Sequence, residues 1–257
     1  MVKNVPILGN PSSGKTTLLI ALIHKLQLNG WIKSRVKDLP KEYPMWIARL
    51  MAGEEIPTTT EFREVRLRLN SFTYKGSKVN LGWGGINLSV RDMKGDDYRR
   101  RTNVFRDAVK EASAVLFTVD CTKDTILGRA ISGQVEPLLE GLRYICEFEH
   151  EVKYIGLVFT KRALHSFPIE QIRPFVTEQF AVMLSFVRDA RIRFGMFEVE
   201  SRGRTNELKP WGIEPVIYDC FSTIGKLKGK RLDVTLGPDA DWAENQRLID
   251  NGTANPR

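Results

Sequence analysis

The chain has 257 residues and a formal net charge of +8, with 42% hydrophobic and 27% charged residues. This balance excludes a disordered chain, which is less apolar, and a membrane-embedded chain, which is more apolar. No run approaches the ~18 apolar residues of a membrane span, and the N-terminus carries no secretory signal. The three widely spaced cysteines provide neither a disulfide framework nor a CxxC metal site. We therefore expect a cytoplasmic protein.

Short β-rich runs alternate with longer helical patterns along the chain, which predicts an α/β fold. We expect a mostly parallel central sheet with one antiparallel strand and helices on both faces. The first half predicts a strand over 5–8, helices over 15–28 and 43–51, and an antiparallel hairpin whose runs are 64–73 and 86–90, with a turn at 75–77. The second half predicts helices over 97–111, 135–148, 169–194 and 213–224, and strands over 114–119, 154–160 and 196–200.

These elements predict one domain over 1–228, with a helical insertion near 31–55. From residue 229 the sequence becomes polar and rich in Gly, Pro, Asp and Asn, so we expect 229–257 to be a tail or loosely packed extension. The net charge permits attraction to nucleic acid but does not favour it, because basic clusters such as 99–101 lack the interleaved aromatic residues of a base-stacking platform.

The strongest motif lies between the first strand and the first helix. It matches the Walker A pattern G-x-x-x-x-G-K-[ST], and its residues with the next one are Gly9, Asn10, Pro11, Ser12, Ser13, Gly14, Lys15, Thr16 and Thr17. The glycines let backbone amides point inward, and the helix N-terminus favours anions, so the loop suits a di- or triphosphate. Lys15 supplies charge for the outer phosphates, and Thr16 offers a hydroxyl to Mg²⁺. Together with the α/β pattern, this motif predicts a fold of the P-loop NTPase type. The alternative is a chance glycine-rich turn.

Two further segments are candidates for sensing the last phosphate. Asp92 and Gly95 form an Asp-x-x-Gly motif after the strand over 86–90, where the carboxylate can hold a magnesium-bound water and the glycine amide can meet a γ-phosphate. Thr58 and Thr59 lie in the preceding loop, where a threonine can complete magnesium coordination. Loss of the phosphate would release that loop, as in an order–disorder switch. The alternatives are a turn aspartate and solvent-facing hydroxyls.

This order of motifs resembles that of the Ras-like P-loop GTPases of the translation-factor-related (TRAFAC) class, over residues 3–225. The stretch 50–59 is similar to bacterial members with a helical insertion before the first switch, including GTPase modules of conflict systems. The resemblance implies GTP and GDP as ligands, Mg²⁺ as cofactor, and a protein effector or activator as partner.

One departure from the family pattern concerns the base. The family reads guanine with Asn/Thr-Lys-x-Asp after a strand, and here Thr160 and Lys161 match the first two positions. Ala163 stands where a carboxylate would accept the guanine N1 and N2 protons. A pocket without that acceptor should discriminate less against adenine.

The other departure concerns hydrolysis. Ras-like enzymes commonly place a glutamine after Asp-x-x-Gly to orient the attacking water, and Asp96 stands there in this chain. With Lys15 it is our candidate catalytic residue. A carboxylate accepts a proton from water but repels the γ-phosphate, so unaided hydrolysis should be slow. An arginine from a partner, or one of the arginines at 99–101, would then be needed.

The sequence therefore predicts a GTP-binding molecular switch that hydrolyses GTP slowly and couples nucleotide state to partner binding. Two alternatives stay open. A pseudo-GTPase scaffold would bind its partner regardless of nucleotide, and a P-loop ATPase would have relaxed base specificity. A phosphoryl-transfer kinase is disfavoured, because the hairpin precedes Asp-x-x-Gly and no lid-like arginine segment is present.

Overall fold

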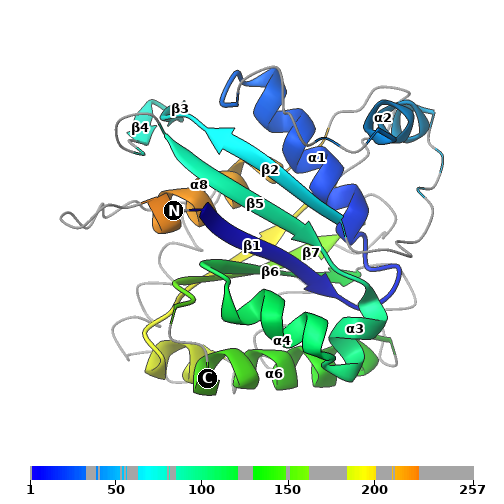
Figure 1. Ribbon diagram of the computed structural model, residues 1–257, viewed down its shortest axis with the longest axis vertical. Coiled ribbons are helices and arrows are strands. Elements are labelled where there is room, and N and C mark those ends of the chain that lie inside the picture. Colours follow the sequence, from blue (N-terminus) through cyan, green and yellow to red (C-terminus); the bar gives the residue numbers. More distant parts are fainter. Residues whose placement is uncertain are drawn as a thin grey trace, which may run out of the picture.

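The fold is given by a computed structural model (Figure 1), which describes residues 2–32, 39, 41–52, 54, 56, 63–79, 81, 85–120, 130–148, 151–161, 184–200, 210 and 212–225. The strands are β1 (Val2–Gly9), β2 (Arg63–Leu69), β3 (Phe72–Tyr74), β4 (Ser77–Val79), β5 (Ile86–Asp92), β6 (Ala114–Asp120), β7 (Tyr154–Thr160) and β8 (Arg193–Glu198). The helices are α1 (Lys15–Leu28), α2 (Tyr43–Met51), α3 (Gly95–Arg100), α4 (Asn103–Lys110), α6 (Ala130–Phe148) and α8 (Ile213–Gly225).

The main sheet has the strand order β2-β5-β1-β6-β7-β8. Its pairs are parallel except for β2 and β5, which run antiparallel with Arg63 opposite Asp92. The predicted fold class is confirmed. In β7 every residue is buried, because helices cover both faces of the sheet at its centre. Because β1, β6 and β7 run parallel, their carboxyl ends meet at one edge of the sheet.

Pro6 lies in β1, between two neighbouring strands, although proline cannot donate a ladder hydrogen bond. Towards β6, Asn4 pairs with Ala112 and Ile7 pairs with Leu116. Two residues of β1 lie between these two pairs, whereas three residues lie between them on the β6 side. This local offset, like a bulge, removes the need for the missing N–H and leaves the pairing of Pro6 with Arg91 on β5 intact.

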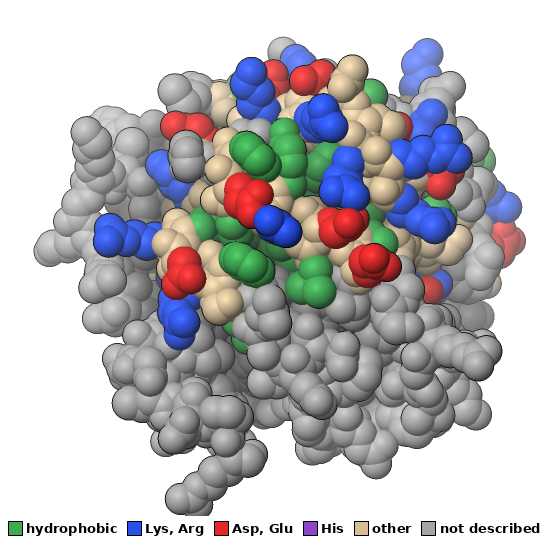
Figure 2. All heavy atoms as spheres, turned by 90° about the horizontal axis from the view of Figure 1, so that it is seen from below, with side chains coloured by type: hydrophobic (Ala, Val, Ile, Leu, Met, Phe, Trp, Pro, Cys, Tyr) green, Lys and Arg blue, Asp and Glu red, His purple; other side chains and the backbone are tan. Residues whose placement is uncertain are grey.

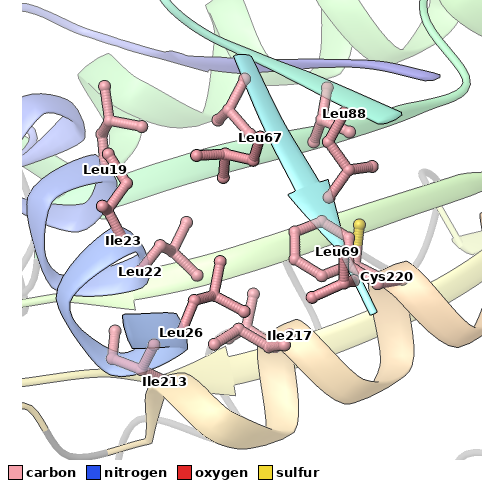
Figure 3. Close-up of a cluster of buried hydrophobic side chains, with 14 of the residues drawn as sticks. Leu19, Leu22, Ile23, Leu26, Leu67, Leu69, Leu88, Ile213, Ile217 and Cys220 are labelled. Carbon is pink, nitrogen blue, oxygen red and sulfur yellow. The ribbon is translucent and has the colours of Figure 1, made fainter. Parts of the chain in front are cut away.

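Two apolar layers enclose the sheet. The first lies between the sheet and helices α1, α2 and α8, and Figure 3 shows Leu22 and Leu26 of α1 directed towards Ile213 and Ile217 of α8. The second lies against α3, α4 and α6, which gather on the opposite side of the strands in Figure 1. Within the described chain, no helix combines the length and apolarity needed to cross a membrane.

The helix predicted over 97–111 is wrong as a single element. The structure divides it into α3 and α4, with Arg101 in the left-handed region at φ 49°. Thr102 then caps α4, since its side-chain oxygen accepts a hydrogen bond from the backbone N–H of Phe105. The Thr102 hydroxyl also donates to Asp97 at 3.1 Å. A threonine N-cap favours a new helix start, which the continuous helical periodicity concealed.

Two other predicted boundaries differ. The strand predicted over 64–73 is interrupted, and β3 and β4 form a separate hairpin whose Phe72 and Tyr74 contact Tyr218 of α8. The helix predicted over 169–194 is helical at 184–189 among the described residues, but the chain is already in β8 at Arg193. Apolar residues at 192, 194 and 196 alternate with the period of a strand and pack in the second layer.

Figure 2 views the molecule from below, on the side of α4 and α6. Lysine and arginine side chains alternate there with acidic and apolar ones over the described surface. Arg101 pairs with Glu140, and Arg143 pairs with Glu147 along α6. This mixture of signs is unlike the basic stripe of a nucleic-acid-binding face.

Candidate phosphate-binding site

The Walker A loop connects the end of β1 to α1, at the edge where the parallel strands finish. Three of its residues have positive φ: Gly9 at 149°, Ser12 at 60° and Gly14 at 84°. A side chain at Gly9 would collide with Thr118 and Ser13, so this position needs glycine for space as well as for conformation. Pro11 and Ser12 are exposed, Ser13 and Thr16 are buried, and Thr17 is half-buried on α1.

Lys15 lies inside the loop with 6% of its surface exposed. Its ammonium donates to the carbonyl oxygens of Gly9 at 3.0 Å and Asn10 at 2.7 Å. Burial lowers the pKa of Lys15 to about 8, although the charges of Asp92 and Asp96 act to raise it. The loop thus holds a cation that is poorly solvated and available to an anion.

Thr16 and Asp92 meet directly beside this lysine. The Thr16 hydroxyl donates to the Asp92 carboxylate at 2.6 Å, and Asp92 is fully buried at the end of β5. One hydroxyl and one carboxylate are donors that suit Mg²⁺, which takes its other ligands from water and phosphate. No group of three or more His, Cys, Asp or Glu side chains arranged to hold a metal occurs in the described part of the chain.

Gly95 brings the start of α3 against the Walker A loop. A Cβ at Gly95 would overlap the backbone nitrogen of Pro11 and lie 2.7 Å from the carbonyl carbon of Asn10. Asp96 follows in the first turn of α3 and is exposed, close enough to Lys15 for its charge to act on that ammonium. The second motif is therefore next to the first, as its predicted role requires.

The residues predicted to face the base lie on the other side of the loop. The Thr160 hydroxyl donates to the carbonyl oxygens of Ser13 at 2.7 Å and Val119 at 3.1 Å. Lys161 has φ 61° and pairs with Asp120 at the end of β6, at 2.6 Å. Thr160 braces the loop, and the Lys161 ammonium is held by a carboxylate. Ala163 lies outside the described residues.

Sequence reasoning missed two residues of this site, Thr118 and Asp120. Both lie near the end of β6, and their positions give no motif because their partners come from distant parts of the chain. The available signal was their place at the carboxyl end of a buried strand, where ligand sites of α/β sheets form. The predicted metal ligands Thr58 and Thr59 fall outside the described residues, so their role stays a prediction.

Comparisons with known proteins extend the description of the fold. No protein-family model and no curated protein matches the chain. Among solved structures, it is similar to the GTPase-like domain of Ski7 from S. cerevisiae, determined with GDP and inorganic phosphate bound, with a TM-score of 0.56 and 11% identity. The match covers 92% of this chain and 52% of the Ski7 chain, so this chain spans about half of that length. The chain therefore shares the fold of this GTPase-like domain.

Proposed function

We propose that the chain is a guanine-nucleotide-binding switch that binds GTP with Mg²⁺, hydrolyses it slowly to GDP and couples the nucleotide state to a protein partner. The observation that carries this proposal is the 2.6 Å contact between the Thr16 hydroxyl and the Asp92 carboxylate, beside the buried Lys15. The Lys15 ammonium and two oxygen groups that suit Mg²⁺ are thereby brought together at the start of α1.

Binding follows from the residues of the loop. Backbone amides between Gly9 and Thr16 would surround the phosphates, and Lys15 would exchange its two carbonyl contacts for phosphate oxygens. Thr16 and Asp92 would hold Mg²⁺, which when bound neutralises phosphate charge. The GDP and inorganic phosphate bound to the structurally similar Ski7 domain support a nucleotide as the ligand class.

Hydrolysis would depend on Asp96. Its exposed carboxylate, next to Gly95, can accept a proton from water approaching the γ-phosphate, but its charge opposes an anionic centre. Arg99, Arg100 and Arg101 are all exposed, and Arg101 pairs with Glu140 at 2.7 Å. These features support a slow reaction that a partner-supplied arginine would accelerate.

Nucleotide state would reach a partner through the segments 56–62 and 92–106. Within the second of these, Gly95 contacts the Walker A loop, and the break at Arg101 separates two short helices. A γ-phosphate arriving at the loop would therefore act first on the start of α3.

A second candidate, a P-loop ATPase with relaxed base specificity, is favoured by the pair Lys161–Asp120. The carboxylate at the base-side end of the sheet is occupied by the lysine, and the motif offers Ala163 in place of an aspartate. Identification of the nucleotide that co-purifies with the chain separates the two candidates, since guanine nucleotide alone is expected for the switch.

Substitution of the lysine tests both candidates. Lys15→Ala should weaken triphosphate binding more than about a hundredfold, because two charge-assisted contacts to phosphate are lost. Lys25→Ala is a matched control on the same helix, where Lys25 pairs with Glu214 instead. Isothermal titration with Mg²⁺–GTP measures the affinities, and equal retention of nucleotide by the Lys15 variant and the parent would refute the proposal.

A further inference from the structure

Ser13 occupies the centre of the Walker A loop. It lies between two residues in the left-handed region, Ser12 at φ 60° and Gly14 at φ 84°. Such positive φ values curl the loop towards the shape of a concave anion site, and the Ser13 N–H donates to the Asn10 carbonyl oxygen at 3.2 Å within this turn. Ser12 is not a glycine, so its conformation costs energy that the surroundings must offset. Whatever holds Ser13 therefore holds the shape of the anion site.

A short hydrogen bond below the loop joins the side chains of Ser13 and Thr118. Their hydroxyl oxygens lie 2.6 Å apart, and either hydroxyl can be the donor. The Thr118 hydroxyl also donates to the carbonyl oxygen of Leu8 at 3.1 Å, since a carbonyl can only accept. The Ser13 side chain is thereby held against β6.

Ser13 is anchored a second time by its backbone. Its carbonyl oxygen accepts a hydrogen bond from Thr160 of β7 at 2.7 Å. Ser13, Thr118 and Thr160 are 1%, 3% and 1% exposed, so water cannot replace these contacts. We call these three residues the Ser13 clamp. It joins the loop to the ends of two adjacent parallel strands.

We propose that Thr118 is a positioning residue that, through the Ser13 hydroxyl, holds the loop in its phosphate-binding shape before the nucleotide arrives. The inference rests on the proposed function, namely that this loop binds phosphate. A preorganised loop binds more tightly because it loses less conformational freedom on binding. Thr118 itself contacts Ser13 and Leu8 and needs no contact with the ligand.

The test uses a nearly isosteric substitution. Thr118→Val leaves the buried Ser13 hydroxyl without its hydrogen-bond partner, and we expect Mg²⁺–GTP affinity to fall about tenfold. The loss should be equal for Mg²⁺–ATP and for inorganic triphosphate, because the loop contacts phosphate and not the base. Thr118→Ser retains the hydroxyl and should keep most of the affinity. Thr223→Val is the matched control, since Thr223 donates to the Asp219 carbonyl oxygen on α8.

A second variant removes the other hydroxyl of this contact. Ser13→Ala leaves Thr118 its hydrogen bond to the Leu8 carbonyl oxygen and should lower affinity in the same base-independent way. If the two hydroxyls act together, the double variant loses no more than Thr118→Val alone. If the losses in affinity are additive, or if both single variants bind like the parent, the positioning role of Thr118 is refuted, while the proposed function is not. Failure of the parent chain to bind any of the three probes would overturn the proposed function as well.

Discussion

The buried ammonium of Lys15 should make nucleotide binding at the proposed site sensitive to alkaline pH. Burial lowers the pKa of Lys15 from 10.5 to about 8 in the ligand-free protein, against the opposing charges of Asp92 and Asp96. A bound phosphate favours the charged form and therefore raises this pKa. In the proposed function the nucleotide binds the protonated lysine, so nucleotide affinity should fall as pH rises above about 8.

The magnitude follows from the same values. The difference between 10.5 and about 8 corresponds to about 3 kcal/mol of interaction free energy, which a phosphate can recover. At pH 9 about one molecule in eleven of the ligand-free protein retains the proton, so affinity should be about tenfold lower than near neutrality. The decrease should continue at about tenfold per pH unit until the pKa of the complex is reached.

Folding stability should show the opposite trend in the same window. Between about pH 8 and 10.5 the unfolded chain binds more protons at Lys15 than the folded chain, so the contribution of this residue to the free energy of unfolding rises with pH. The additional stability given by Mg²⁺–GTP should fall over that range. Urea unfolding at several pH values, with and without nucleotide, measures both quantities.

Lys15→Arg is the control for this prediction, because a guanidinium stays charged throughout. Its absolute affinity is not the readout, since only the slope against pH is compared, and that slope should be nearly flat. A parent affinity that is constant from pH 7 to 9.5, or a slope that Lys15→Arg shares, would refute the assignment of this pH dependence to the lysine.

Two substitutions test how the site is built into the fold. Gly95→Ala should separate α3 from the Walker A loop, because the added Cβ overlaps the Pro11 nitrogen. We expect the free energy of unfolding to fall by about 1–3 kcal/mol and nucleotide binding to weaken. Unchanged urea unfolding and unchanged affinity would contradict this packing. Leu26→Ala should lower the free energy of unfolding by about 2–5 kcal/mol, since the Leu26 side chain of α1 is fully buried in the layer shared with α8 (Figure 3). Leu28→Ala on the same helix, with 64% of Leu28 exposed, should change the urea midpoint little, and similar losses for both would show that α1 packs differently.

Much of the fold was predictable because its signals are local. The helices over Lys15–Leu28 and Tyr43–Met51 and the strand Tyr154–Thr160 form with the predicted bounds. Apolar spacing marks the buried face of a helix, and a continuous apolar run marks a strand covered on both sides. The failures also have a local cause. The Thr102 cap and the alternation at 192–196 were present in the sequence, but the surrounding helical pattern was longer and outweighed them.

The Walker A spacing and the Asp-x-x-Gly motif are sufficient to predict a phosphate site, because the glycines, the lysine and the helix start that such a site needs are neighbours in the sequence. The sequence alone therefore predicted where a phosphate would bind and which lysine would face it. Only the tertiary structure decided what surrounds that loop. Thr118 contacts Ser13, and Asp120 pairs with Lys161; the partners in each pair are more than forty residues apart in the sequence. Gly95, at the start of α3, packs against Pro11 of the Walker A loop. These contacts depend on strand order and register, which no short segment specifies by itself.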